Sequence, residues 1–167
     1  MDLVEAAARA DQLAESGSQQ ELAALRSEWD DELESAARSA DFRARALAFR
    51  AVGQFRWRAK EELLRRGLDD GSPAARGSAL LSIELLSRDH PSTVNGVRPL
   101  LHKMAADAEE NAAVRRLTVL ALKNGSPQRE TIVLLEGLSS DDRADADLRR
   151  AAGGVAQALK RRAAARR

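Results

Sequence analysis

The segment that decides the fold reads Asn111-Ala112-Ala113-Val114-Arg115-Arg116-Leu117-Thr118. It begins with a helix-capping residue, has an arginine four positions later and ends on a small residue. Three other segments share this pattern, namely Asp41–Ala48, Ser72–Ala79 and Asp145–Ala152. Their arginines, Arg45, Arg76, Arg115 and Arg149, are 31, 39 and 34 residues apart. This is the spacing of a repeated helical hairpin, so we expect a chain built from helix pairs.

The composition of the chain predicts an all-α fold. Alanine is the commonest of its 167 residues, leucine and arginine follow in equal number, and aromatic residues make up 3%. Ala, Leu, Arg and Glu favour helices, whereas β-branched residues are too scattered here to form strands. The lack of cysteine excludes disulfides and zinc–thiolate sites. With no signal-peptide pattern and no apolar run near the roughly 20 residues of a membrane span, we expect a cytoplasmic protein.

The four signature segments predict helices that share one buried face. Counted from the residue before each arginine, offsets 0, 3, 4, 7 and 8 are apolar or small in every copy, which is the periodicity of an amphipathic helix. In the first copy these offsets are occupied by Ala44, Leu47, Ala48, Ala51 and Val52. Each helix has an N-cap residue whose side chain can accept an amide hydrogen bond, and these are Asp41, Ser72, Asn111 and Asp145.

Apolar segments of similar length lie between the signature helices and predict their packing partners. We expect these partner helices over residues 56–68, 92–107 and 127–138, with two more helices upstream over 2–15 and 19–39. The expected product is a right-handed α-solenoid of about four antiparallel helix pairs plus an N-terminal helix. The solenoid is expected to form a single domain over 1–167, with N-terminal helices at 1–39, repeats at 40–162 and a basic tail at 163–167.

The repeated pattern Asp/Asn-x-x-Val/Leu-Arg-x-x-Ala resembles the start of the second helix of a HEAT repeat. It is most similar to the short bacterial HEAT-like repeats of phycobilisome-lyase-type proteins. Val114-Arg115 and Leu148-Arg149 carry the best matches, whereas the first copy departs from the pattern with Phe42 and Ala44 and the second with Ser72-Pro73. The resemblance covers residues 40–162 and implies an armadillo-like solenoid. It implies little about function, because such solenoids bind many unrelated partners.

The repeated arginine occupies an unfavourable place. In the first turn of a helix the macrodipole disfavours a cation by about 0.3–1 kcal/mol, so each guanidinium needs an acceptor. One interpretation is a ladder in which each arginine contacts a capping residue or a carbonyl of a neighbouring repeat; the other is a groove for an anionic ligand. We favour the ladder, which comprises Asp41, Arg45, Arg76, Asn111, Arg115, Asp145 and Arg149.

Charge is segregated along the chain. Residues 1–40 carry a net charge of −7 and residues 41–68 carry +5, although the whole chain is at +1. The basic segment is the best candidate for a binding surface for an acidic protein or a nucleic-acid backbone. Internal neutralisation by the acidic helix expected over 19–39 is an equally good interpretation. The candidate surface comprises Arg43, Arg50, Arg56, Arg58 and Lys60.

Residue patterns typical of catalysis are scarce. His90 precedes Pro91 in an expected turn, and His102 is expected to face solvent. Two lone histidines match no metal-binding spacing. The acidic cluster Asp30-Asp31-Glu32-Glu34 is better interpreted as a charged helix face than as a metal site. The sequence therefore predicts no catalytic residue, no metal site and no cofactor.

These observations favour a non-enzymatic scaffold that presents a curved helical surface to a partner protein whose identity the sequence does not reveal. One alternative is a nucleic-acid-binding HEAT-like protein, similar to the alkylpurine DNA glycosylases of this architecture. The lack of tyrosine and the presence of only two tryptophans speak against it. A further alternative, which only the name of the repeat subfamily implies, is an accessory lyase or chaperone for a tetrapyrrole-bearing partner.

Overall fold

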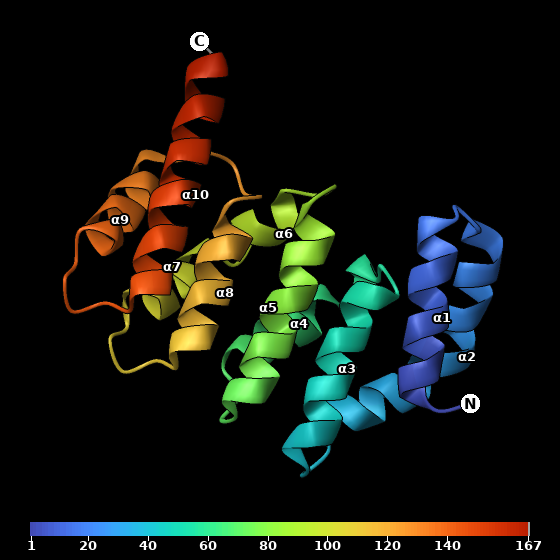
Figure 1. The fold of residues 1–167 in the computed structure, drawn as a ribbon. Coiled ribbons are helices and arrows are strands. Elements are labelled where there is room, and N and C mark those ends of the chain that lie inside the picture. The colour runs from blue at the N-terminus through green and yellow to red at the C-terminus, as the bar shows by residue number, and fades with distance from the viewer. Residues whose placement is uncertain (167) are drawn as a thin grey trace. The chain divides into compact units, whose positions relative to one another are not determined.

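The computed structural model describes residues 1–166, and every element of regular structure in that range is helical (Figure 1). The described residues form ten α-helices and one short 3-10 helix. The prediction of an all-α fold is confirmed. The chain divides into two compact units, Met1–Leu86 and Ser87–Arg167. Across the described part of the chain, no helix combines the length and apolar character needed to cross a bilayer.

The first unit packs its N-terminal helices around α3. Helices α1, α2 and α3 contact one another, and α4 packs on α3. Helix α5 approaches α3 closely at Gly53, where an added Cβ would lie 2.8 Å from the Cα of Ser82. The elements are α1 (Leu3–Glu15), α2 (Gln19–Ala37), α3 (Phe42–Gln54), a 3-10 turn (Arg58–Lys60), α4 (Glu61–Leu68) and α5 (Pro73–Ser87).

The second unit is organised around its last helix. Helix α10 packs against α8 and α9, and α7 packs against the same two helices. The core between them is formed by aliphatic side chains such as Leu101, Leu122, Leu135 and Leu159, all fully buried. The elements are α6 (Ser92–Asn95), α7 (Arg98–Ala106), α8 (Ala112–Leu122), α9 (Arg129–Ser139) and α10 (Ala146–Ala165).

The predicted N-caps are confirmed. The side chain of Asp41 accepts from the amide of Arg43 in the first turn of α3. Asn111 and Asp145 each accept from two amides in the first turns of α8 and α10. The hydroxyl of Ser72 accepts from the amide of Ala75 at 3.4 Å, which is a weaker cap.

The predicted partner helices are shorter than the sequence suggests. The segment 56–68 begins with Arg56 in the left-handed region (φ 49°), continues through the 3-10 turn and becomes α-helical at Glu61. The segment 92–107 is split between α6 and α7 near Gly96, and Pro99 lies in the first turn of α7, where its missing N–H costs nothing. The helix predicted over 127–138 begins at Arg129.

The shared buried face is rotated relative to the prediction. Offsets 4, 7 and 8 are buried in all four signature helices, as predicted. Offset 3 is not buried in any of them, and at this offset Leu47 of α3 is 48% exposed. Offset 5 takes its place in the first three helices, where Phe49, Leu80 and Val119 are buried. The prediction of a buried offset 3 is therefore wrong, and in the first three helices the buried face extends instead toward offset 5.

Candidate functional site

Lys60, one of the predicted basic surface residues, is paired inside the first unit. Its ammonium group donates to the carboxylates of Asp30 at 2.5 Å and Glu34 at 2.7 Å, both on α2. The same group lies 5.0 Å from the ring centroid of Trp57. The hydrogen bond from Lys60 lowers the pKa of Glu34 below its usual range. Part of the acidic 19–39 helix therefore neutralises part of the basic segment.

Arg56 is also engaged within the unit. Its guanidinium donates to the carboxylate of Asp11 on α1 at 2.6 Å. Its carbonyl, together with that of Phe55, accepts from the guanidinium of Arg26 on α2 at 2.8 Å. A cation at the C-terminal end of a helix is favourable, so Arg26 stabilises the end of α3. Arg58 pairs locally with Glu61 at 3.3 Å.

Two residues of the predicted surface remain on α3 without an acidic partner in the described chain. The guanidinium of Arg43 lies 5.6 Å from the ring centroid of Phe42, whose side chain is 44% exposed. In Arg50 the Nη1 atom is buried and lacks a hydrogen-bond partner. The five residues therefore do not act as one uniform basic surface.

In the first unit, the repeated arginines converge on the loop before α5. The Arg45 guanidinium forms a two-pronged contact with the Asp70 carboxylate at 2.7 and 2.9 Å. The Arg76 guanidinium donates to the Asp70 backbone carbonyl at 2.8 Å. Arg45 and a backbone hydrogen bond from Ser72 both lower the pKa of Asp70, Arg45 most strongly. Asp70 therefore joins two signature helices, through its carboxylate to Arg45 and through its carbonyl to Arg76.

In the second unit the repeated arginines are used differently. Arg115 is 7% exposed, and its guanidinium donates twice to the carbonyl of Ala105 at the end of α7, at 3.0 and 3.1 Å. Arg149 has a buried Nε atom without a hydrogen-bond partner, and its Nη1 lies 3.9 Å from Asp142. In the part of the chain that the structure describes, the side chains of Asp41, Asn111 and Asp145 accept from amides of their own helices and not from these arginines.

A buried polar cluster joins α6, α7 and α9. Arg98, only 6% exposed, donates to the Thr131 hydroxyl and to the Ser126 carbonyl, both at 2.8 Å. The Nε2 atom of His102 lies 2.8 Å from the same hydroxyl, so the expectation that His102 faces solvent is wrong. Burial lowers the pKa of His102, and Arg98 adds to this effect while Glu130 opposes it. Because every member contacts another, the cluster is a structural anchor.

The aromatic and acidic residues give no support to base stacking or metal binding. The two tryptophans, Trp29 and Trp57, are buried at 7% and 9% exposure and serve as hydrophobic anchors. Asp30 and Glu34 of the acidic cluster accept from Lys60. Within residues 1–166, no group of three or more His, Asp or Glu side chains is placed to hold a metal ion.

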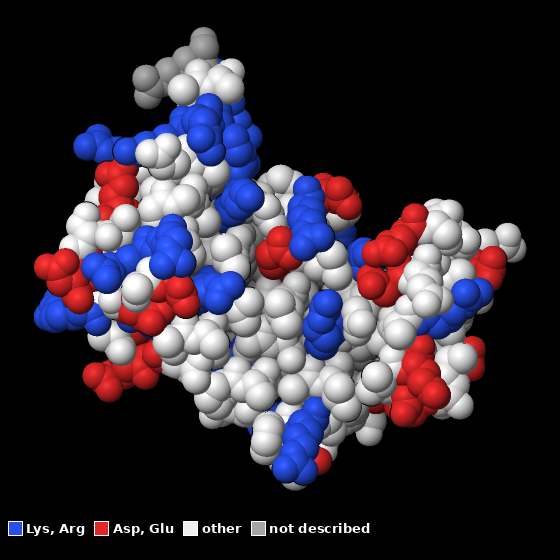
Figure 2. Space-filling view, viewed as in Figure 1, with Lys and Arg blue, Asp and Glu red and all other residues white. Residues whose placement is uncertain are grey.

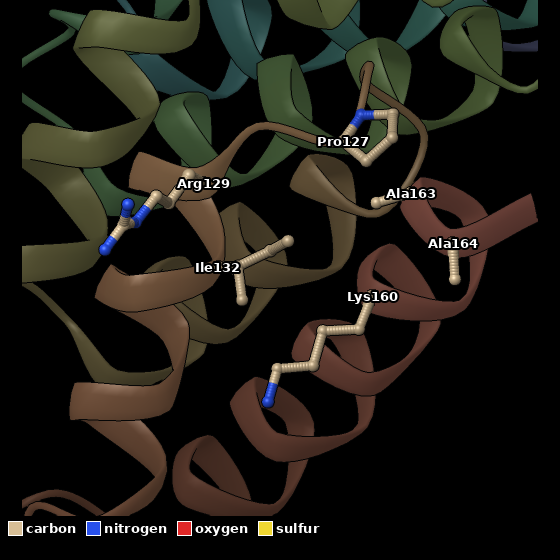
Figure 3. A pocket seen from close by; sticks show the side chains of 6 residues that line it. All are labelled: Pro127, Arg129, Ile132, Lys160, Ala163 and Ala164. Carbon is tan, nitrogen blue, oxygen red and sulfur yellow. The ribbon is translucent and has the colours of Figure 1, made fainter. Parts of the chain in front are cut away.

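An apolar groove of about 400 Å³ lies between the start of α9 and the end of α10 (Figure 3). Ile132 projects from α9 between Arg129 and the stem of Lys160, while Ala163 and Ala164 lie opposite on α10 (Figure 3). The ammonium group of Lys160 is bound to Glu136. The groove is lined by Pro127, Arg129, Ile132, Lys160, Ala163 and Ala164. The sequence did not predict this groove, because the two segments that line it are about 30 residues apart in the chain.

Arg129 and Lys160 line this groove, and further basic side chains follow along the end of α10. Lys and Arg side chains gather at the C-terminal end of α10 (Figure 2). Arg162 donates to the Gly125 carbonyl at 2.9 Å and to the Lys123 carbonyl, which ties this end of α10 to the loop after α8. The described part of the predicted basic tail is therefore helical as far as Ala165. Arg167 lies outside the described residues. The basic side chains here are Lys160, Arg161, Arg162 and Arg166.

Comparison with known proteins leaves the family open: no protein-family model, no curated protein and no solved structure matches this chain. The HEAT-like resemblance and the continuous solenoid therefore stay predictions.

Proposed function

We propose that this protein is a non-enzymatic protein–protein interaction module whose binding site is the groove between α9 and α10. The observation that carries the proposal is an apolar groove of about 400 Å³ with arginine and lysine at its rim. Ligand sites are commonly concave and mostly apolar with a few polar groups, and an amphipathic helix of a partner protein binds in a hydrophobic groove of the same kind. The HEAT-like resemblance supports the same function, since solenoids of this kind present helical surfaces to partner proteins.

The partner segment that fits this groove is an acidic amphipathic helix. Its apolar stripe would pack on Ile132, Ala163 and Ala164, where small alanine side chains allow a helix to approach closely. Its acidic residues would lie beside Arg129 and the basic end of α10, which attracts negative charge. Recognition of an amphipathic helix in a groove commonly uses apolar anchors spaced three or four residues apart.

The basic segment of the first unit supports this role less well. Arg56 and Lys60 are engaged with Asp11, Asp30 and Glu34, and breaking those contacts would oppose binding. At the end of α10 positive charge is in excess, because no acidic side chain among residues 1–166 pairs with Arg161 or Arg166.

The test is a titration of isotope-labelled protein with a synthetic amphipathic peptide of leucine and glutamate, followed by amide NMR. We expect the shifts to map to Ile132, Ala163 and Ala164, and we expect a peptide with lysine in place of glutamate to bind far more weakly. The variant Ile132→Glu should abolish binding, since it places a charge in the groove.

Val133→Glu is the matched control, because Val133 is the neighbouring residue on α9, is 58% exposed and does not line the groove. It should bind the acidic peptide like the wild type. Equal binding of the two peptides, or equal loss of binding in both variants, would contradict the proposal. Amide shift changes confined to the first unit would also contradict the proposal.

A further inference from the structure

A second cavity lies within the first unit, where arginines from α3, from α4 and from the residue after α2 line it. It has a volume of about 360 Å³. Arg38 follows the last residue of α2, Arg45 lies in the first turn of α3, and Arg66 lies in the last turn of α4. The only carboxylate in its lining is that of Asp70, and buried Phe49 and Leu63 form its apolar part. The lining therefore has more positive than negative charge.

Arg45 is a fixed member of this cavity. Two of its nitrogens, Nε and Nη2, bind the Asp70 carboxylate at 2.7 and 2.9 Å. The third, Nη1, donates to the carbonyls of Ser39 and Ala40 at 3.0 and 3.1 Å. The Asp70 carboxylate is in turn occupied by Arg45 and by the amide of Ser72 at 2.9 Å. Asp70 is thereby committed to these contacts and does not neutralise the other two arginines.

Arg38 and Arg66 are the exposed members of the cavity lining. The side chain of Arg38 is 58% exposed, and its guanidinium contacts the Glu34 carboxylate at 2.8 Å. The same carboxylate also accepts a hydrogen bond from Lys60. An exposed ion pair of this kind contributes little free energy, so Arg38 can turn toward a ligand at small cost. Arg66 is exposed. It forms no ion pair with any residue in the range 1–166, not even with Glu62, which lies one helical turn earlier.

We propose that this cavity binds a small phosphate monoester, with the phosphate held between Arg38 and Arg66 and the carbon part packed on Phe49 and Leu63. The site lies in the first unit and does not depend on the proposed groove between α9 and α10. It gives a binding role to one member of the arginine repeat, Arg45, whose fixed guanidinium adds positive charge at the back of the cavity.

A phosphate monoester suits the site for three reasons. Guanidinium groups match the geometry of phosphate oxygens and can donate two hydrogen bonds to them. A phosphate monoester carries a charge of about −1.5 to −2 at neutral pH, more than one carboxylate can supply. A volume of about 360 Å³ is at the small end of ligand cavities, which admits a phosphate with a short carbon body.

The experiment uses phenyl phosphate as the probe, with benzoate and inorganic phosphate as comparisons, and follows binding to the full chain by amide NMR. We expect phenyl phosphate to perturb the amides of Phe49 and Leu63 and to bind at least about tenfold more tightly than benzoate. Inorganic phosphate should perturb the same region with lower affinity, because it lacks the ring. Arg38→Gln and Arg66→Gln should each weaken phenyl phosphate binding about tenfold.

Arg65→Gln is the matched control, because Arg65 is exposed, precedes Arg66 on α4 and does not line the cavity. It should keep the wild-type affinity. Circular dichroism of each variant confirms the fold, and Arg38 and Arg66 are exposed enough to be replaced without loss of core contacts. The proposal is overturned if phenyl phosphate perturbs no amide in this region, if benzoate binds as tightly, or if Arg65→Gln weakens binding as much as Arg66→Gln.

Discussion

Arg56 adopts a left-handed backbone conformation at the end of α3 (φ 49°), and its guanidinium binds Asp11 of α1 at 2.6 Å. The amide of Arg56 donates to the Gly53 carbonyl, and the next amide, of Trp57, donates to the Val52 carbonyl. These two bonds define a helix-ending motif in which this position is usually glycine. The arginine therefore tolerates backbone strain at a place where its side chain joins two helices.

This relationship predicts an unusual order of variant stabilities. Arg56→Ala keeps the strained backbone and loses the contact with Asp11, whereas Arg56→Gly loses the contact but relieves the strain. We expect Arg56→Ala to be less stable than Arg56→Gly by about 1 kcal/mol in urea unfolding. Asp11→Asn should be destabilised as well, because it weakens the contact without touching the backbone strain. An Arg56→Ala protein at least as stable as Arg56→Gly would contradict the assignment of strain.

Replacing either of two helical glycines with alanine should change the stability of the protein, but in opposite directions. Gly53→Ala places a Cβ 2.8 Å from the Cα of Ser82, a backbone atom that cannot move without shifting α5. We expect a loss of about 1–3 kcal/mol in the free energy of unfolding. Gly154→Ala in α10 meets no atom within 4 Å, so it should stabilise the protein by about 0.5–1 kcal/mol through helix propensity. Thermal or urea unfolding of the two variants compares them directly, and the same sign for both would refute the packing described.

The His102 cluster predicts a pH dependence of stability. Burial lowers the pKa of His102 below its ordinary value of 6.5, so the unfolded chain binds a proton at a higher pH than the folded chain. As the pH falls below 6.5, the unfolded state therefore holds more protons and the free energy of unfolding decreases. Above that pH the contribution of His102 is constant.

The check is urea unfolding between neutral pH and the range where carboxylates begin to titrate. His102→Gln should show a flatter pH dependence than the wild type. His90→Gln, a change in an exposed turn, should leave the dependence as it is. If the wild type and His102→Gln had parallel curves, the buried imidazole would not be the group responsible.

The contact between Asp70 and Arg45 predicts a second pH dependence of stability, at a lower pH than that of His102. The pKa of Asp70 is lowered below 3.8, chiefly by the hydrogen bonds from Arg45, so its stabilising contribution is complete above that pH and is lost as the pH falls further. Asp70→Asn should lower stability at neutral pH and reduce its decrease at acidic pH. Asp69→Asn, an exposed change one residue earlier, should alter the free energy of unfolding by less than about 0.5 kcal/mol. Equal effects of the two variants would argue against the contact with Arg45.

The helix starts were predictable because they depend on local chemistry. Asp41, Asn111 and Asp145 cap the helices that follow them whatever lies elsewhere in the chain. The buried face was only partly predictable. In an alanine-rich helix the apolar stripe is broad, so Leu47 and Phe49 are both plausible core residues from periodicity alone, and tertiary packing decides between them.

The candidate sites depend on contacts between distant segments, which periodicity does not encode. For Lys60 the sequence leaves two interpretations open, a surface cation or a partner of the acidic helix, and the contacts with Asp30 and Glu34 that decide between them form only when α2 packs in the first unit. Arg98 is unexpected in a core, since arginine is seldom buried without partners. It is buried here because Thr131 and the Ser126 carbonyl, about 30 residues away, meet it.

The close approach of α3 and α5 links two positions of the chain. The Ser82 hydroxyl accepts from the Gly53 amide at 3.0 Å and donates to the Phe49 carbonyl at 2.5 Å, so it joins a donor and an acceptor one helical turn apart. Glycine at 53 leaves the space, and serine at 82 uses it. In an evolving lineage these two positions should covary: a bulkier residue at 53 would persist only with a changed residue at 82 or a wider separation of the helices.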